Sequence, residues 1–174
     1  CDEDYPKYGT HIKCNPAIKR RSDMEALRSA VAQGLPGAVA TDHAPHLLTE
    51  KDGSYTQAPS GLPTIQHSLR MMLQLSKQGV FPIGMVPQMM SHAPAVTFHI
   101  AERGYIREGY FADLVLVEES KSRNATPAYK CGWTPIDEKS LDFGVVHTLV
   151  NGKFIVRDYK LTGIKNGKRL TFDR

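Results

Sequence analysis

The sequence has few cysteines, few aromatic residues and no long apolar run. Its 174 residues include three cysteines without a Cys-x-x-Cys pair, so neither a disulfide framework nor a thiolate zinc site is expected. Aromatic residues make up 8% of the chain and the formal net charge is +4, which does not suit a nucleic-acid surface of basic stripes and stacking rings. Pro82 and Pro87 break the most apolar stretch, which is too short for a membrane span. We therefore expect a cytoplasmic protein that binds neither nucleic acids nor membranes.

The length of the chain limits the folds that it can complete on its own. At 174 residues it is shorter than the roughly 200 residues at which complete (β/α)8 barrels begin. The chain opens on Cys1, its first stretch is polar, and its best motif comes early. We therefore expect the C-terminal part of a larger α/β enzyme.

One segment carries the strongest chemical signal. The apolar residues 38–41 have the character of a buried strand, and Asp42, His43 and His46 follow them directly. Catalytic groups of (β/α)8 barrels lie at the C-terminal ends of the strands, so Asp42 is the leading catalytic candidate. From the residues alone, an aspartate that caps a turn is an equally good interpretation. Pro45 excludes a helical metal-ligand pair of Asp42 with His46, so both would be mounted on a loop.

Hydrophobic periodicity predicts helices and strands in alternation. The predicted strands cover residues 11–14 and 38–41, and the predicted helices cover residues 23–33, 64–77 and 86–101. Ser22 and Glu25 have the spacing of a capping box, which predicts that Ser22 caps the first helix. Pro36 and Gly37 predict the turn into the second strand, so that strand, helix and strand form a βαβ unit. We expect the last helix to be interrupted near Pro94.

Strand signals replace helical ones from residue 104 onward. The predicted strands cover residues 113–117, 145–150 and 154–156. Asn151-Gly152 between the last two is a strong signal for a two-residue hairpin turn. We therefore divide the chain into residues 1–103, the last strands and helices of a barrel, and residues 104–174, a small β domain.

Asn15 ends the first predicted strand, so in a barrel its amide would face the same mouth as Asp42. An amide both donates and accepts hydrogen bonds, and could recognise an amide or a carboxylate of a substrate. From the residues alone, an Asx turn before Pro16 is the better interpretation. We expect the Asp42 side chain to lie near Asn15 and His46 and to be turned away from bulk solvent.

Four motifs together resemble one enzyme family. They are Lys13-Cys14-Asn15-Pro16, Thr41-Asp42-His43-Ala44-Pro45-His46, Ala58-Pro59-Ser60-Gly61-Leu62 and the Gly-x-Ile-x-x-Gly-x-x-Ala-Asp-Leu pattern of residues 104–114. Over nearly its whole length the chain resembles the C-terminal half of the dihydroorotases, a family of the amidohydrolase superfamily. The Thr-Asp-His-Ala-Pro-His string is the specific motif, because the last pattern belongs to the whole superfamily.

The resemblance implies both a fold and a chemistry. The fold would be the C-terminal part of a TIM-like (β/α)8 amidohydrolase barrel, followed by the C-terminal part of a small β-sandwich domain. Asp42 would ligate one of two zinc ions and act as general base and acid. Asn15, His46 and the backbone of Ser60 and Gly61 would contact the substrate. The reaction would interconvert N-carbamoyl-L-aspartate and dihydroorotate in pyrimidine biosynthesis.

The sequence also departs from the family pattern. The other zinc ligands, among them a His-x-His pair, have no counterpart here, although a hydrolytic zinc takes three protein ligands. We therefore expect isolated residues 1–174 to be inactive and to need the N-terminal half of the barrel as a partner. Ser60 replaces a common aromatic residue and Ala17 a common proline. His92 matches the start of a family helix and is expected to cap it.

Two rival interpretations stay open. Another cyclic amidohydrolase, of the allantoinase or hydantoinase type, would share the barrel and the β domain. A non-catalytic assembly subunit would have no physical need for Asp42, Asn15 and His46 together. The resemblance further suggests a homo-oligomer, with aspartate transcarbamoylase as a candidate partner.

Overall fold

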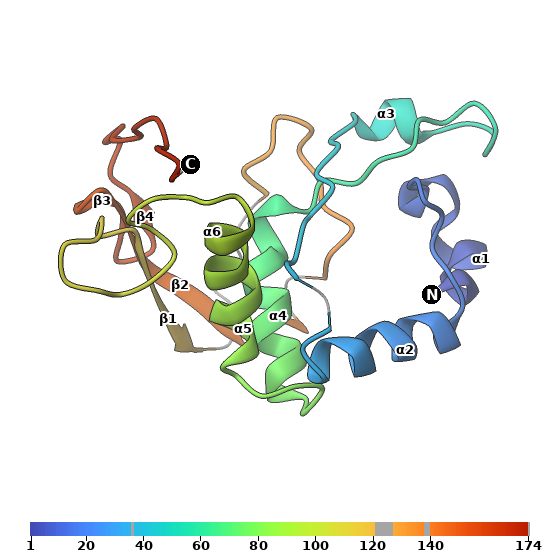
Figure 1. Ribbon diagram of the computed structural model, residues 1–174. Coiled ribbons are helices and arrows are strands. Elements are labelled where there is room, and N and C mark those ends of the chain that lie inside the picture. Colours follow the sequence, from blue (N-terminus) through green and yellow to red (C-terminus); the bar gives the residue numbers. More distant parts are fainter. Residues whose placement is uncertain (36, 121–126, 138–139, 174) are drawn as a thin grey trace.

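The computed structural model describes residues 1–35, 37–120, 127–137 and 140–173. N-terminal helices, central helices and a β-sheet follow one another across the molecule (Figure 1). The helical elements are the 3-10 turns η1 (Asp2–Asp4), η2 (Gly9–Ile12) and η3 (Ile65–His67), the π turn η4 (Gln88–His92), and the helices α1 (Tyr5–Tyr8), α2 (Arg21–Ala32), α3 (Leu48–Lys51), α4 (Ser68–Lys77), α5 (Met85–Pro87) and α6 (Ala93–Thr97). The strands are β1 (Leu114–Glu119), β2 (Phe143–Val150), β3 (Lys153–Arg157) and β4 (Lys160–Leu161). None of the helices in the described ranges combines the length and the apolar character needed to cross a membrane.

Helix α2 confirms the first predicted helix, but it begins at Arg21. The prediction that Ser22 caps this helix is wrong, because the N-cap is Arg20, whose backbone N–H donates a hydrogen bond of 3.1 Å to the Asp23 carboxylate. That carboxylate lies in the first turn, where the helix dipole favours negative charge. Pro36, half of the turn predicted after this helix, lies outside the described residues.

The two strands predicted in the first half of the chain are wrong. Where the first was expected, η2 forms, and Lys13 follows it in an extended conformation. Residues 38–41 alternate between exposed and partly buried positions as a strand would, yet they join no ladder among the described residues. The N–H of Val39 bonds instead to a helix carbonyl, 3.1 Å away, and His43 makes one isolated parallel bridge to Leu62. A parallel strand is stabilised by covering neighbours, which the described ranges do not supply, so the βαβ unit does not form.

The other two predicted helices are confirmed. Helix α4, preceded by η3, covers the segment predicted at residues 64–77. Elements α5, η4 and α6 run on from Met85 to Thr97 as the third. The π turn η4 lies just before Pro94, as expected where proline lacks an N–H and crowds the preceding turn. The helix ends before the predicted residue 101, and His99 has a φ of 52°.

His92 does not cap a helix, contrary to the prediction. It lies within the continuous run of η4 and α6, and its side chain makes no capping hydrogen bond. Its Nδ1 lies 3.2 Å from Oε1 of Gln88, and its ring stacks on Tyr105 with centroids 4.3 Å apart. His92 therefore stabilises the packing of the helix against the chain that follows it.

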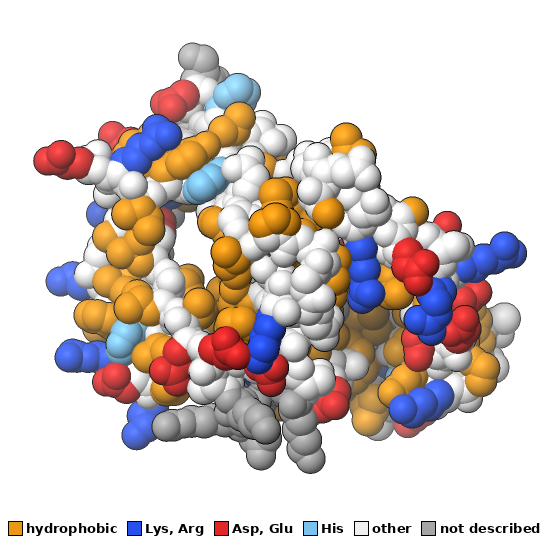
Figure 2. Space-filling model, turned by 90° about the horizontal axis from the view of Figure 1, so that it is seen from below, with side chains coloured by type: hydrophobic (Ala, Val, Ile, Leu, Met, Phe, Trp, Pro, Cys, Tyr) orange, Lys and Arg blue, Asp and Glu red, His pale blue; other side chains and the backbone are white. Residues whose placement is uncertain are grey.

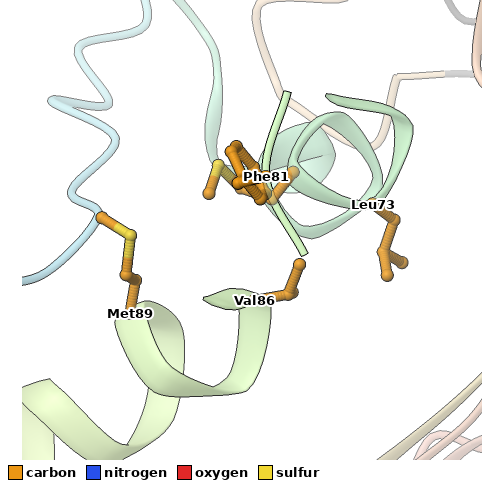
Figure 3. Packing of buried hydrophobic residues seen from close by; sticks show 5 residues of the cluster. Leu73, Phe81, Val86 and Met89 are labelled. Carbon is orange, nitrogen blue, oxygen red and sulfur yellow. The ribbon is translucent and has the colours of Figure 1, made fainter. Parts of the chain in front are cut away.

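A hydrophobic cluster holds the central helices together. Its buried members are Met72, Leu73, Phe81, Val86 and Met89. In Figure 3, Leu73 lies on α4, Phe81 on the connecting segment, and Val86 and Met89 on the helix that follows. Val39 packs against this cluster. The segment that leads to Asp42 is therefore anchored in the core.

The C-terminal region forms an antiparallel sheet with strand order β1-β2-β3-β4. The three predicted strands are thereby confirmed, and β4 is an additional short one. Asn151 and Gly152 have φ values of 48° and 78°, as a type I′ hairpin turn requires. The described ranges contain one multi-stranded sheet. The β-sandwich and the domain boundary at residue 104 stay predictions.

An apolar cavity of about 630 Å³ lies between the sheet and the central helices. Leu73, Val86 and Met90 line its helical side, and Val115 and Val117 line its sheet side. Figure 2 shows hydrophobic side chains around the hollow between these parts. Strand β1 is an edge of the sheet, and Val115 on it is 49% exposed. Among the described residues, the outer edge of β1 therefore has no strand partner and lies beside an apolar surface.

Candidate functional site

Three segments that carry the predicted site residues lie side by side. They are residues 13–16, 41–46 and 58–62. The backbone N–H of Gly61 donates to the carbonyl of Lys13, 3.0 Å away, and the N–H of Ala44 donates to the carbonyl of Leu62, 3.1 Å away. Segment 58–62 is thus hydrogen-bonded to both of the others, and three motifs far apart in the sequence form one structural unit.

Gly61 allows this close packing. Its φ is 144°, a value that residues with a Cβ rarely adopt. A Cβ at this position would lie 2.6 Å from the Ala44 carbonyl oxygen and 3.0 Å from Cδ2 of His46. Only glycine lets the backbones of the two segments approach this closely.

His46 is held through both its side chain and its backbone. Its Nε2 lies 3.2 Å from the carbonyl oxygen of Ser60, so Nε2 carries the proton in this contact, because a carbonyl only accepts. Trp133 donates its indole N–H to the His46 carbonyl at 2.8 Å. The His46 side chain is 30% exposed, which leaves part of the ring open to a ligand.

His43 has a structural role. Its Nδ1 accepts hydrogen bonds from the backbone N–H groups of Thr64 and Ile65, at 3.0 and 3.3 Å. Its ring packs against Tyr129, with centroids 4.9 Å apart. The Thr64 hydroxyl also donates to the carbonyl of Thr41, 2.8 Å away. These contacts fix the backbone on both sides of residue 42.

Asp42 has an unusual backbone and an exposed side chain. Its φ of 45° lies in the left-handed region, which aspartate tolerates better than most residues. No group among the described residues forms a hydrogen bond or ion pair with its carboxylate. The turn-cap interpretation is therefore wrong, because a cap must accept a backbone N–H. The expectation that this side chain is turned away from solvent is also wrong for this chain, in which Asp42 is exposed.

Asn15 is exposed as well, and its peptide bond to Pro16 is cis. The Asx turn favoured from the residues alone does not form, because no N–H in the described ranges donates to the Asn15 side chain. Its amide donors and acceptor are therefore open to a ligand.

Lys51 belongs to this unit, and the sequence did not reveal it. The residue ends α3 and is 0% exposed. Its ammonium donates to three carbonyl oxygens, those of Lys13 at 2.9 Å, Pro59 at 3.0 Å and Gly61 at 3.0 Å. Burial lowers the pKa of Lys51 from its ordinary value. A lysine in a polar loop is ordinarily a surface residue, so no sequence pattern marks this one.

The chain after β1 returns to the site, which the sequence also did not reveal. Besides the Trp133 bond to His46, the hydroxyl of Tyr129 accepts the N–H of Gln66 at 2.6 Å. In Figure 1 the returning segment runs beside the chain that leads into α3. Contacts of this kind join residues more than sixty positions apart, and local periodicity carries no information about them.

The residues that the structure describes do not by themselves fit a zinc site. Across the ranges that the structure describes, no group of three or more His, Cys, Asp or Glu side chains is placed to hold a metal ion. Asp42 is a single carboxylate, whereas a hydrolytic zinc takes three protein ligands.

The sequence matches the family model for the amidohydrolase family over residues 7–155, and the chain therefore belongs to the amidohydrolase family. It is 30% identical to the dihydroorotase of Endomicrobium trichonymphae over 160 residues, which cover 88% of this chain and 37% of that protein. The dihydroorotase of Pelobacter propionicus is 31% identical over 159 residues, which cover 90% of this chain and 37% of that protein. The resemblance to dihydroorotases is thus confirmed, and the chain spans about 37% of the length of these relatives.

Solved structures of hydantoinases share the fold. A D-hydantoinase matches with a TM-score of 0.80 at 20% sequence identity, over 94% of this chain and 38% of that one. The L-hydantoinase (dihydropyrimidinase) from Arthrobacter aurescens matches with a TM-score of 0.82 at 20% identity, over 92% of this chain and 37% of that one. These likenesses establish an amidohydrolase fold of mixed helix and sheet, which is consistent with the predicted barrel. At such identities they carry no information about the substrate.

Proposed function

We propose that this chain is part of a cyclic-amide hydrolase that interconverts N-carbamoyl-L-aspartate and dihydroorotate in pyrimidine biosynthesis. The observation that supports this proposal is the joining of the three dihydroorotase-like motifs into one unit. The bonds from Gly61 to Lys13 and from His46 to Ser60 hold these motifs together. Backbone and side-chain polar groups from three segments can then surround one small polar ring.

Asp42 is the proposed proton carrier. During ring opening its carboxylate would accept a proton from the attacking water and pass it to the departing ring nitrogen. Its left-handed backbone is of the strained kind that clusters at functional sites. The hydrogen bonds of His43 and Thr64 hold the chain on both sides of it, so the carboxylate is positioned without being occupied by a described protein group.

Asn15, His46 and the backbone of Ser60 and Gly61 are the proposed substrate contacts. They would hold the carboxylate and the ring edge of dihydroorotate. Hydrolysis of an unstrained amide needs the water and the carbonyl to be aligned before attack. Groups mounted on hydrogen-bonded segments supply such alignment better than groups on independent loops.

Zinc dependence is part of the same proposal. Asp42 would supply one ligand, and the remaining ligands would belong to the part of the enzyme outside this chain. A homo-oligomer, aspartate transcarbamoylase as a partner and a cytoplasmic location rest on the resemblance alone.

Hydrolysis of a hydantoin or of allantoin is the second candidate function, and the fold shared with hydantoinases is compatible with it. A substrate panel with the full-length protein separates the candidates. We expect dihydroorotate to have a higher kcat/KM than hydantoin or allantoin. A higher value for either of the other two would replace our proposal with the second candidate. Absence of turnover with all three substrates would favour a non-catalytic assembly subunit.

A further inference from the structure

We propose that Lys51 is a positioning residue that fixes the two backbone segments expected to contact the substrate. The proposal rests on the proposed function and adds to it a residue outside the Thr41–His46 and Ser60–Gly61 motifs. Lys51 would act through the backbone, without touching the substrate.

The three carbonyl groups that Lys51 binds mark out its role. Pro59 and Gly61 flank Ser60, and their oxygens lie 3.0 Å from the ammonium nitrogen. Lys13 lies two residues before Asn15, and its oxygen is 2.9 Å away. One side chain therefore holds the backbone on both sides of Ser60 and just ahead of Asn15.

The ammonium group matches this set of acceptors. It has three donor hydrogens and no acceptor, and the three carbonyls account for all of its donors. Within the described ranges no carboxylate pairs with Lys51, although it is 0% exposed. Removal of one partner from a buried charged contact is costly, because the groups left behind lose their hydrogen bonds. The fully hydrogen-bonded ammonium group therefore holds the three carbonyls in one fixed arrangement.

The neighbouring lysine behaves differently. Lys13 Nζ donates to the carbonyls of Tyr55 and Ala58, each 2.6 Å away, so it fastens the loop before Ser60. Its own carbonyl accepts from both Lys51 and the N–H of Gly61. Lys51 is thus the side chain that ties the Asn15 segment directly to the Ser60 and Gly61 backbone.

Removal of the ammonium should loosen substrate binding more than it slows chemistry. Lys51→Met leaves three buried carbonyls without this donor, and hydrogen bonds to charged groups contribute more than neutral ones. Loss of contacts made equally in the ground state and the transition state raises KM and leaves kcat unchanged. We expect KM for dihydroorotate to rise about tenfold or more in the full-length enzyme, which equals about 1.4 kcal/mol or more of binding free energy.

The test compares Lys51→Met and Lys51→Gln with wild type and with Lys153→Met, in the full-length protein. Lys153 is an exposed lysine on β3, so its variant controls for the loss of a lysine. Steady-state kinetics with dihydroorotate gives kcat and KM, and amide hydrogen exchange reports on the Gly61 N–H. We expect a raised KM, a nearly unchanged kcat and faster exchange at Gly61 for Lys51→Met, a smaller effect for Lys51→Gln, and wild-type values for Lys153→Met.

Several results would overturn the proposal. Two are kinetic: an unchanged KM in both Lys51 variants, or a fall in kcat without a rise in KM. The third is failure of both variants to fold, because Lys51 would then be needed for the fold as a whole. If wild-type protein turns over no cyclic amide, the proposed function fails separately. In that case amide hydrogen exchange tests the positioning role of Lys51 without turnover. Faster exchange of the Gly61 N–H in Lys51→Met than in wild type supports this role, and unchanged exchange rejects it.

Discussion

Two residues of the candidate site have backbone conformations that most side chains avoid. Asp42 has a φ of 45° and Gly61 a φ of 144°. The first is tolerable for aspartate, whereas the second requires glycine, because a Cβ would meet the Ala44 backbone. Backbone geometry therefore requires glycine at position 61, and it allows aspartate at position 42.

The sequence motifs located the candidate residues Asn15, Asp42, His46, Ser60 and Gly61, while their roles in chemistry stay predictions. The motifs did not locate Lys51 or Trp133. These two side chains donate hydrogen bonds to backbone carbonyls. Every residue has a backbone carbonyl, so the sequence does not indicate which ones accept these bonds. Their roles become visible once the segments are placed side by side.

Replacement of Asp42 tests the proposed chemistry. We expect Asp42→Asn in the full-length enzyme to lower kcat between about 100-fold and 10,000-fold, the usual contribution of general acid–base catalysis. Asparagine also tolerates a left-handed backbone and the position is exposed, so the melting temperature should not change. Steady-state kinetics and thermal unfolding measure both effects, with the exposed Asp52→Asn as control. Turnover close to wild type would remove Asp42 from the proposed role.

Replacement of Gly61 tests the close approach of the segments. We expect Gly61→Ala to destabilise the full-length protein by more than the about 1–3 kcal/mol of backbone strain alone, because the new Cβ would also meet Ala44 at 2.6 Å. Gly53→Ala is the matched control, since Gly53 has a φ of 123° and an added Cβ there would meet no described atom within 4 Å. Chemical denaturation measures both variants. Equal losses would show that contact with Ala44 contributes nothing.

At the scale of elements, helices were more predictable than barrel strands. Helices α2 and α4 satisfy their backbone hydrogen bonds locally, so the periodicity of their own residues predicts them. Residues 38–41 have strand-like alternation of exposure but lack ladder partners in the described ranges. The C-terminal strands formed as predicted because β2 and β3 pair with each other through the Asn151-Gly152 turn.

A lysine at the end of α4 connects that helix to the sheet. Lys77 Nζ lies 2.7 Å from Oδ2 of Asp142 and 2.5 Å from Oε1 of Glu119 on β1. The hydrogen bond to Asp142, followed by that to Glu119, raises the pKa of Lys77 above its ordinary value of 10.5. The ion pairs therefore stabilise the fold below pH 10.5, and their contribution disappears as the pH rises through the higher pKa of the folded state.

We expect Lys77→Met to melt at a lower temperature than wild type at neutral pH. The difference should shrink only when the pH is well above 10.5, the ordinary pKa of lysine. Thermal unfolding across alkaline pH measures it, with Lys153→Met as the control for loss of an exposed lysine. A difference that does not depend on pH would assign the effect of Lys77 to packing of its stem.

At the scale of the whole molecule, the chain spans about 37% of the length of its curated relatives, and its sheet edge exposes apolar side chains. The edge strand β1 carries Val115 and Leu116, which are 49% and 47% exposed. The cavity of about 630 Å³ beside it is lined by both helices and sheet. A strand edge that has no strand partner in the described ranges, next to apolar surface, is a site where another strand can pair.

We expect residues 1–174 alone to hydrolyse no dihydroorotate, even with added zinc. The physical reason is the single carboxylate, Asp42, where a hydrolytic zinc takes three protein ligands. A sensitive assay of the purified chain, with the full-length protein as positive control, measures this. Detectable turnover that follows the chain through purification would contradict the expectation.

The sequence by itself determined helices α2 and α4, the helical run from α5 to α6, the C-terminal hairpin and membership of the amidohydrolase family, because these depend on local periodicity, turn chemistry and short motifs. The tertiary structure alone decided which segments meet: Gly61 on Lys13, His46 on Ser60, and Lys51 between them. Such contacts join residues distant in sequence through backbone groups that every residue carries. The amino-acid sequence therefore does not indicate these contacts, and only the folded structure shows them.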